Sequence, residues 1–403
     1  MMAERALEGL KVLEWGHFVA APYCGKLLAD MGADVLKIEP PDTGDNARQR
    51  EPYPDNIPNQ ETSGFFLYLN TSKRGITLDV STATGKKIFT QLVKQVDVLV
   101  EDHTPAELKA LGLTYDVLKK VNPQLIMTSL SPFGQTGPYA NYNAYALNTN
   151  MAGGEGYLLP GGVTDRPPVR PGLFISDYDG GLFGAIATLG AYYGRQAGGP
   201  GQHIDMPRVM ATVSLTRTAL GKYTHSSHLI DSRDGRGPRI GSNMKMKDGY
   251  LVVRVSTQAW WELFTDKVMG GPAWTKEPRF HENAERLKRP IEVNEKLLQW
   301  SINQPKKEIE RKTQAVGIPA GVIATVKDLA EDEHLAARGF FTELDHPRAG
   351  KQKYPGVSYI HSETPWAMRS PAPLLGQHNE DVYVRELGYT REQLVKLREA
   401  GVI

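Results

Sequence analysis

Two carboxylates and two glycines stand together in the stretch ISDYDGGLFGA, which covers residues 175–185. Asp177 and Asp179 are one residue apart, and Gly180 and Gly181 follow at once. A carboxylate is a weak nucleophile in water, but it becomes competent in a dry site beside an activated acyl group. Because glycine has no Cβ, a bulky acyl substrate could approach the backbone there, and the two N–H groups could donate to a developing oxyanion. These residue types suggest acyl transfer onto an aspartate.

A purely structural role explains the same residues. If the glycines open a helix at residues 182–193, Asp177 or Asp179 could cap that helix, and the glycines could allow close packing. The positive end of the helix dipole would favour a carboxylate in either case. Taken alone, the pattern D-x-D-G-G favours this structural interpretation, and one of the two acids is expected to be a cap.

The elements that must position this stretch follow from the first third of the chain, where apolar strands alternate with helices. We expect strands at residues 11–16, 34–40, 96–102 and 124–130, and helices at residues 21–31 and 81–95. Such alternation is typical of a parallel sheet covered by helices on both faces. Ligands of these sheets lie at the carboxyl ends of the strands. The sequence therefore predicts an α/β fold with a Rossmann-like large domain.

A dinucleotide is the first ligand that such a fold suggests, but its motif is missing. The turn after the first strand reads GHFVAAPYCG, which contains no G-x-G-x-x-G. The glycine-rich stretch DGRGPRIGSN, residues 234–243, has the wrong spacing and opens no helix. A nicotinamide-dependent oxidoreductase is therefore not expected.

The length of 403 residues and a change of pattern along the chain predict two domains. We expect a large Rossmann-like domain at residues 1–205, a linker at 206–232, and a smaller α+β domain at 233–325. Residues 326–403 are expected to form a second linker and to return to the large domain.

Composition limits the partners. The 47 Lys and Arg residues nearly balance the 46 Asp and Glu residues, so no overall field favours nucleic acid or an anionic membrane. No apolar run approaches the ~20 residues needed to cross a bilayer, and the N-terminal residues carry no apolar signal-peptide core. Cys24 is the only cysteine, which excludes an intrachain disulfide and a cysteine-based metal cluster. We expect a cytoplasmic protein without nucleic acid, membrane or metal partners.

Five stretches, distributed over nearly the whole chain, carry a family likeness when they are taken together. They cover residues 7–45, 66–140, 176–206, 317–341 and 370–389, and include LEWGHFVAAPYCGKLLADMGADVLKIEPPDTGD, LNTSKRGITLDV, SDYDGGLFGA and SPAPLLGQHNEDV. In these stretches the chain resembles the family III CoA-transferases of the formyl-CoA transferase and carnitine CoA-transferase type, also called the CaiB/BaiF family. The resemblance implies a Rossmann-like large domain, a smaller α+β domain and an intertwined homodimer.

The resemblance also implies the nucleophile and the reaction. In this family the nucleophile is the first aspartate of a D-x-x-small-Gly element before a small-residue helix. DYDGG matches with Asp177 in that position, whereas Asp179 falls at a variable position. The implied reaction transfers CoA from an acyl-CoA donor, such as succinyl-CoA, to a carboxylic acid through an acyl–aspartyl anhydride and an aspartyl-CoA thioester. The CoA thioester is then a substrate, and no metal or permanently bound cofactor is implied.

The CoA contacts implied by the resemblance follow the predicted strands. The matching positions are His17, Phe18, Val19 and Ala20 after the first strand, Asn70, Lys73 and Arg74 in LNTSKRG, Asp102, His103 and Thr104 after VDVLVE, and Tyr145 near the active carboxylate. Pro40, Ala110 and Asn143 depart from the formyl-CoA transferase pattern, which has basic residues there. Arg48 and Lys109 are candidate substitutes for the nucleotide and phosphate contacts. The glycine loop of that enzyme is not reproduced, and residues 234–243 are only a loose candidate.

Two other functions compete with CoA transfer. An α-methylacyl-CoA racemase shares the fold and needs a base on each face of the α-carbon, one of them from a His–Asp pair. Neither alignment of that pair, at residues 142–145, supplies a histidine. The chain could instead be a catalytically silent subunit of a hetero-oligomeric transferase, against which an intact Asp177 argues. The sequence selects no particular acid.

Overall fold

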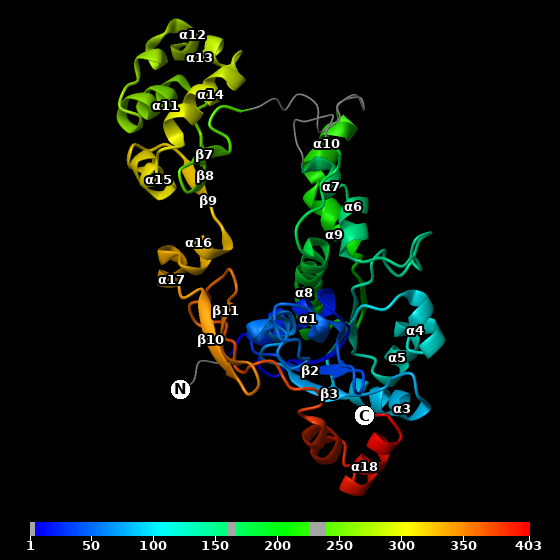
Figure 1. The fold of residues 1–403 in the computed structure, drawn as a ribbon. Coiled ribbons are helices and arrows are strands. Elements are labelled where there is room, and N and C mark those ends of the chain that lie inside the picture. Colours follow the sequence, from blue (N-terminus) through cyan, green and yellow to red (C-terminus); the bar gives the residue numbers. More distant parts are fainter. Residues whose placement is uncertain (1–4, 160–166, 226–238) are drawn as a thin grey trace. The chain divides into compact units, whose positions relative to one another are not determined.

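The computed structural model of the protein describes residues 5–159, 167–225 and 239–403. These residues form two compact units (Figure 1). Unit 1 contains the described residues up to 225 together with residues 339–403, and unit 2 contains residues 239–338. The chain therefore leaves unit 1, builds unit 2 and returns.

Unit 1 is built on a six-stranded parallel sheet, which confirms the predicted α/β class. Its strands are β1 (Lys11–Trp15), β2 (Asp34–Glu39), β3 (Arg74–Thr77), β4 (Val98–Glu101), β5 (Ile126–Ser129) and β6 (His203–Asp205). The order β3-β2-β1-β4-β5-β6 reverses its direction between β1 and β4. In open sheets of this kind, the ligand crevice lies at the carboxyl ends of the strands beside such a reversal. The sequence analysis did not anticipate β3 and β6.

Helices cover both faces of this sheet. The helices of unit 1 are α1 (Ala20–Asp30), α2 (Gly64–Leu69), α3 (Ala83–Val93), α4 (Pro105–Leu111), α5 (Tyr115–Val121), α6 (Ala146–Ala152), α7 (Glu155–Leu158), α8 (Ile175–Gln196), α9 (Arg208–Leu215), α10 (Arg217–His225) and α18 (Arg391–Glu399). Successive strand residues point to opposite faces. Val12 and Val98 therefore pack with α1 and α8 on one face, whereas Leu13 and Leu99 pack with α3, α5 and α18 on the other.

Part of the expected linker at 206–232 is helical. Helix α9 begins three residues after the end of β6 and packs against α8 and α6. Residues 208–215 therefore belong to the body of unit 1 and stand next to the carboxyl end of β6.

The returning segment, residues 339–403, completes unit 1. It forms the hairpin of β10 (Phe341–His346) and β11 (Gly350–Pro355), then a π-helical turn, η5 (Glu380–Glu386), and finally α18. The Tyr383 hydroxyl donates to the carbonyl of Thr77 over 2.6 Å. Val402 and Ile403 lie in the same core as the sheet residues of β1 and β2.

Unit 2 is a small α+β unit. Its sheet has the order β7-β8-β9 and is antiparallel. The elements are β7 (Met244–Met246), β8 (Gly249–Val253), α11 (Gln258–Leu263), α12 (Pro278–His281), α13 (Asn283–Arg286), α14 (Pro290–Ser301), α15 (Lys306–Ala315), β9 (Ala320–Ile323), α16 (Val326–Ala330) and α17 (Glu333–Ala337). Its core gathers around Trp261, Phe264 and Phe280.

Short helical turns complete the inventory. They are the 3₁₀ turns η1 (Asn46–Gln49), η2 (Pro54–Asn56) and η4 (Ala273–Lys276), and the π-helical turn η3 (Phe264–Val268). Within the described ranges, no helix is both long and apolar enough to cross a membrane.

Candidate active site

Asp177 lies in the first turn of α8, not ahead of the helix as the sequence analysis expected. Its side chain is buried, and Oδ1 accepts a hydrogen bond from Nη1 of Arg208 over 2.7 Å. Gly180 and Gly181 lie inside α8, where helical geometry turns their N–H groups toward carbonyls one turn earlier. The prediction that these N–H groups face an oxyanion is therefore wrong.

The glycines of α8 serve close packing. A Cβ on Gly180 would lie 2.9 Å from Cγ of Arg208, so the bare position gives that side chain room to reach Asp177. A Cβ on Gly181 would lie 2.7 Å from the carbonyl oxygen of Ala20, and it would force α8 away from α1. Gly180 thus makes room for a charged side chain, and Gly181 for a neighbouring helix.

The charge state of Asp177 reflects two opposed effects. Burial raises its pKa, the Arg208 guanidinium lowers it, and the balance lies above the ordinary value for an aspartate. The Asp102 carboxylate raises it further. Arg208 is itself largely buried, with 12% of its side chain exposed, and its Nε is buried with no hydrogen-bond partner in the described part of the chain. In this ion pair the buried Nε–H of Arg208 therefore makes no hydrogen bond within the described residues.

Asp179 does not cap α8, although one of the two acids was expected to do so. The N-cap is Phe174, whose side chain makes no capping bond. Burial, followed by repulsion from Glu155, raises the pKa of Asp179 to about 6. One carboxylate oxygen of each of these two residues is buried without a hydrogen-bond partner among the described residues.

Three neighbours place Asp177 at the carboxyl edge of the sheet. Arg208 follows β6, and Asp102 follows β4. Phe174, directly before α8, packs edge to face on Phe18 after β1, with ring centroids 4.7 Å apart. Residues that follow β1, β4 and β6 therefore lie around Asp177.

The turn after β1 is held by its backbone. The N–H of His17 donates to Asp102, and the N–H of Phe18 donates to Asp45, each over 2.9 Å. Lys37 donates to the carbonyl of Gly16 over 3.1 Å and forms an ion pair with Asp45. Phe18 has a φ of 66°, a left-handed backbone conformation that residues other than glycine rarely adopt. Buried charges thus fix a strained turn at the predicted CoA contact, ahead of the buried Val19 and Ala20.

A cavity of about 200 Å³ opens at the carboxyl ends of β1, β2 and β3. Its lining is mostly apolar and consists of Trp15, His17, Ile38, Glu39, Pro40, Pro41, Leu78, Asp79, Val80, Ser81 and Leu111. Among the predicted CoA contacts, His17 is the one that lines it.

His103 lies beside the same edge. Its ring stacks on Trp15, with centroids 3.8 Å apart, and its Nδ1 lies 3.2 Å from Glu101. Burial lowers the pKa of His103, but the hydrogen bond and charge of Glu101 outweigh it and the pKa is raised. Thr104 caps α4 by accepting from the N–H of Glu107, and Lys109 lies exposed on the same helix.

Asn70, Lys73 and Arg74, the predicted CoA contacts in LNTSKRG, already have partners within the protein. Lys73 is buried, and its ammonium contacts Glu14 at 2.7 Å, Asn70 at 2.9 Å and the carbonyl of Pro22 at 2.7 Å. Burial lowers the pKa of Lys73 to about 8. Arg74 begins β3, at the amino edge of the sheet, where it pairs with Asp34. Phosphate contacts by Asn70, Lys73 or Arg74 would therefore compete with existing bonds, and they stay predictions.

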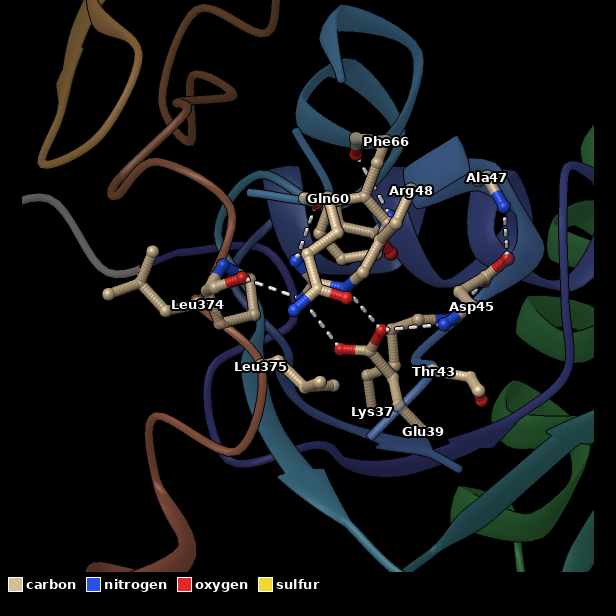
Figure 2. Close-up of polar contacts among 12 residues, drawn as sticks. Lys37, Glu39, Thr43, Asp45, Ala47, Arg48, Gln60, Phe66, Leu374 and Leu375 are labelled. Carbon is tan, nitrogen blue, oxygen red and sulfur yellow. Dashed lines mark hydrogen bonds and ion pairs between the residues drawn. The ribbon is translucent and has the colours of Figure 1, made fainter. Parts of the chain in front are cut away.

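Arg48 is equally committed (Figure 2). Its guanidinium makes two hydrogen bonds to Glu39, at 2.7 and 2.8 Å, and one to Glu61 at 2.8 Å. It also donates to the carbonyls of Gln60 and Pro373, and it lies over the ring of Phe66. These contacts favour a structural role for the buried Arg48 over the predicted contact with a nucleotide.

Tyr145 is 81% exposed and precedes the first residue of α6. That helix reaches α8 through a hydrogen bond between the hydroxyls of Thr149 and Ser176, 2.6 Å apart. Tyr145 therefore starts a helix that touches the turn carrying Asp177. Residues 234–238 of the loose glycine-loop candidate lie outside the described residues.

Sequence reasoning missed Arg208. Arg208 follows HIDMP, a stretch that was not recognised as a strand, so its place at the carboxyl edge went unseen. Asp45 stands in PPDTGD, within residues 39–45 that follow a predicted strand, and its partners are the N–H groups of Phe18 and Ala47 and the ammonium of Lys37.

The chain is similar to known proteins over nearly its whole length. Residues 7–379 match the family model described as CoA-transferase family III. The chain is 32% identical to the succinyl-CoA–D-citramalate CoA-transferase of Chloroflexus aurantiacus over 99% of this chain and 98% of that protein. It is also 32% identical to the formyl-CoA:oxalate CoA-transferase of Streptomyces coelicolor, over 100% of both chains.

A solved structure gives the same picture for the fold. A CAIB/BAIF family protein from Brucella suis superposes with a TM-score of 0.84 at 28% identity, covering 94% of this chain and 99% of that one.

Proposed function

The chain belongs to CoA-transferase family III, and on that premise we propose that Asp177 carries first an acyl group and then CoA. The reaction would move CoA from an acyl-CoA donor, such as succinyl-CoA, to a carboxylic acid. The observation that carries this proposal is a buried carboxylate, paired with one guanidinium, at the carboxyl edge of the sheet.

Four displacements make up the proposed cycle. The Asp177 carboxylate attacks the donor carbonyl, the C–S bond breaks, and an acyl–aspartyl anhydride and CoA thiolate result. The thiolate attacks the aspartyl carbonyl, which gives aspartyl-CoA thioester and releases the donor carboxylate. The acceptor carboxylate attacks this thioester and expels the thiolate. Finally, the thiolate attacks the acceptor carbonyl of the new anhydride, which yields acceptor-CoA and free Asp177.

Burial suits such a cycle. Anhydrides and thioesters are hydrolysed when water has access, so the intermediates need a site from which water is excluded. The carboxylate must nonetheless be ionised to attack. Burial raises the pKa of Asp177, and the Arg208 guanidinium opposes that rise.

For CoA itself we propose a path along the carboxyl edge of the sheet. The cavity at the ends of β1, β2 and β3 offers apolar walls from Pro40, Leu78 and Leu111, which suit a flat heteroaromatic ring. His17, which lines this cavity, and the exposed Lys109 of α4 are the predicted contacts for the rest of the molecule.

We further propose that two copies of the chain associate. Three helices of unit 1 expose large apolar side chains: Ile186 and Tyr193 of α8, Met210 of α9, and Leu220 of α10 are 51–79% exposed. These side chains are the candidate interface of the proposed dimer. Light scattering coupled to size-exclusion chromatography tests the state, and a monomer at micromolar concentration would contradict it.

Mass spectrometry tests the chemistry. Protein incubated with succinyl-CoA is quenched with hydroxylamine, which converts an activated aspartyl group to its hydroxamate. We expect the mass change on Asp177 in the native protein and its absence in Asp177→Ala. If several acyl-CoA donors leave Asp177 unmodified, the transferase mechanism fails. Deuterium exchange at the α-carbon of an acyl-CoA would then support a racemase instead.

The acceptor screen starts with dicarboxylic acids. The two relatives are named for citramalate and oxalate, which both belong to that class. Formation of the new CoA thioester, followed by chromatography, identifies the acceptor.

A further inference from the structure

The positions of Asp177 and Arg208 are fixed by the elements that carry them. Arg208 is the first residue of α9, and its backbone N–H donates to the carbonyl of Ser131, just after β5, over 3.1 Å. Its side chain crosses α8 where Gly180 lacks a Cβ, and it ends on Asp177. Two helices and a strand end therefore fix the guanidinium against the acid.

The pair leaves part of the guanidinium unused. A guanidinium can bind a carboxylate through two parallel N–H groups. Asp177 takes one hydrogen bond from Nη1, while Nε–H is buried without a partner in the described ranges. Most buried donors in proteins are satisfied, so this one calls for an explanation. An anion that arrives during the reaction would supply the missing partner.

Charge conservation defines what that anion can be. Each displacement in the proposed cycle consumes one anion and creates another, so the reacting groups keep a net charge of −1 throughout. When Asp177 is an anhydride or a thioester it is neutral, and the negative charge lies on the CoA thiolate or on the donor or acceptor carboxylate. A largely buried guanidinium without its counterion is strongly disfavoured.

We propose that Arg208 is a catalytic residue that binds, in turn, whichever anion the reaction leaves: the Asp177 carboxylate, the CoA thiolate, or the substrate carboxylate. This inference rests on the proposed function of Asp177 and adds the group that retains the leaving anion. Retention matters because the thiolate expelled in one step is the nucleophile of the next. Loss of the thiolate to solvent would end transfer and leave an acyl-enzyme open to hydrolysis.

Binding of succinate tests the inference without turnover. Asp177→Asn replaces the carboxylate by a neutral group of the same shape and so imitates the acylated state. We expect it to bind succinate at least about tenfold more tightly than the native protein, because the freed guanidinium makes a charge-assisted pair. In Asp177→Asn combined with Arg208→Gln, the gain should vanish. Isothermal titration calorimetry at fixed ionic strength measures both dissociation constants.

Arg195 provides a matched control. It also pairs with an aspartate, Asp97, at 2.7 Å, and 11% of its side chain is exposed, compared with 12% for Arg208. Asp177→Asn combined with Arg195→Gln should keep the whole gain in succinate affinity. If Asp177→Asn shows no gain, or if the gain survives Arg208→Gln, the inference is overturned. Should that double variant not fold, Asp177→Asn with Arg208→Lys replaces it. Lysine should keep only part of the gain, and a full gain would count against the guanidinium.

A kinetic measurement completes the test. In Arg208→Gln we expect CoA transfer to fall about 10²–10³-fold, as for the loss of an electrostatic group in other active sites. Free thiol released per acyl-CoA consumed should rise. Transfer near the native rate without thiol release would contradict the proposal. If the native protein itself shows no Asp177 adduct, the proposed function fails, while succinate binding still decides whether Arg208 takes an anion.

Discussion

Two buried arginines of unit 1 differ in how completely they are bonded. Arg48 makes five hydrogen bonds, two of its partners are carboxylates, and an aromatic ring covers it (Figure 2). Arg208 makes one side-chain hydrogen bond, to Asp177, and leaves Nε unpaired within the described residues. Both are charged and largely buried, and both lie near the carboxyl edge of the same sheet.

This difference in hydrogen bonding distinguishes a structural role for Arg48 from a catalytic role for Arg208. A fully bonded buried charge holds its surroundings in one arrangement, because any movement breaks several bonds at once. A partly bonded charge keeps capacity for a ligand and costs stability until that ligand arrives. By this criterion Arg48 fastens η1 to β2 and to the returning segment, whereas Arg208 belongs to the reaction.

The largest effect is expected at the acid itself. Asp177→Asn should lower CoA transfer at least ~10⁴-fold, because it removes the nucleophile. Its thermal midpoint should fall, because Arg208 is left largely buried without its counterion. Activity is measured by chromatography of CoA thioesters, and stability by circular dichroism. Residual transfer within a hundredfold of native would place the covalent chemistry elsewhere.

Exchange of each arginine for methionine tests whether the two arginines have different roles. Arg48→Met leaves Glu39 buried without its cation, so we expect a loss of about 3–5 kcal/mol in the free energy of unfolding. Arg208→Met should cost less, because Asp177 can take up a proton. Chemical unfolding followed by fluorescence measures both. Equal losses would show that the number of bonds does not separate the two roles.

The two adjacent glycines of α8 provide a second pair of variants. Gly181→Ala puts a methyl group against the backbone of α1, and overpacking of this kind costs about 1–3 kcal/mol. Gly180→Ala meets the flexible side chain of Arg208 instead. We expect it to lower transfer about tenfold through misplacement of the guanidinium, with a smaller change in stability. The reverse pattern would argue against Gly180 as the space for Arg208.

The smallest effect concerns Asp179. Its folded pKa of about 6 lies above its ordinary value, so between these two pH values the folded state binds more protons than the unfolded state. Stability must then decrease as pH rises through this window. Asp179→Asn should therefore gain stability relative to the native protein between pH ~4 and ~6, and the gain should level off above. Unfolding curves at several pH values measure it. A constant difference would mean that Asp179 titrates normally.

The sequence predicted the fold class better than the surroundings of Asp177, the candidate nucleophile. Alternating apolar strands predict a parallel sheet from local pattern alone, and the family motif carries Asp177. Strand β6 has only three residues, too few to give a recognisable strand pattern, so the position of Arg208 after it was not predicted. Lys73 and Arg74 illustrate another limit. A sequence gives the charge of a side chain but not its direction, and here Lys73 pairs with Glu14 and Arg74 with Asp34.

The path of the chain also affects how the protein is made. The core of unit 1 contains Val402 and Ile403, and the N–H of Asp79 bonds to the carbonyl of Val402. A ribosome adds roughly 5–20 residues per second. The first 225 residues therefore wait on the order of ten seconds or more for their final packing partners, while unit 2 is being synthesised. During that interval the face of the sheet that α18 will cover is a natural substrate for chaperones.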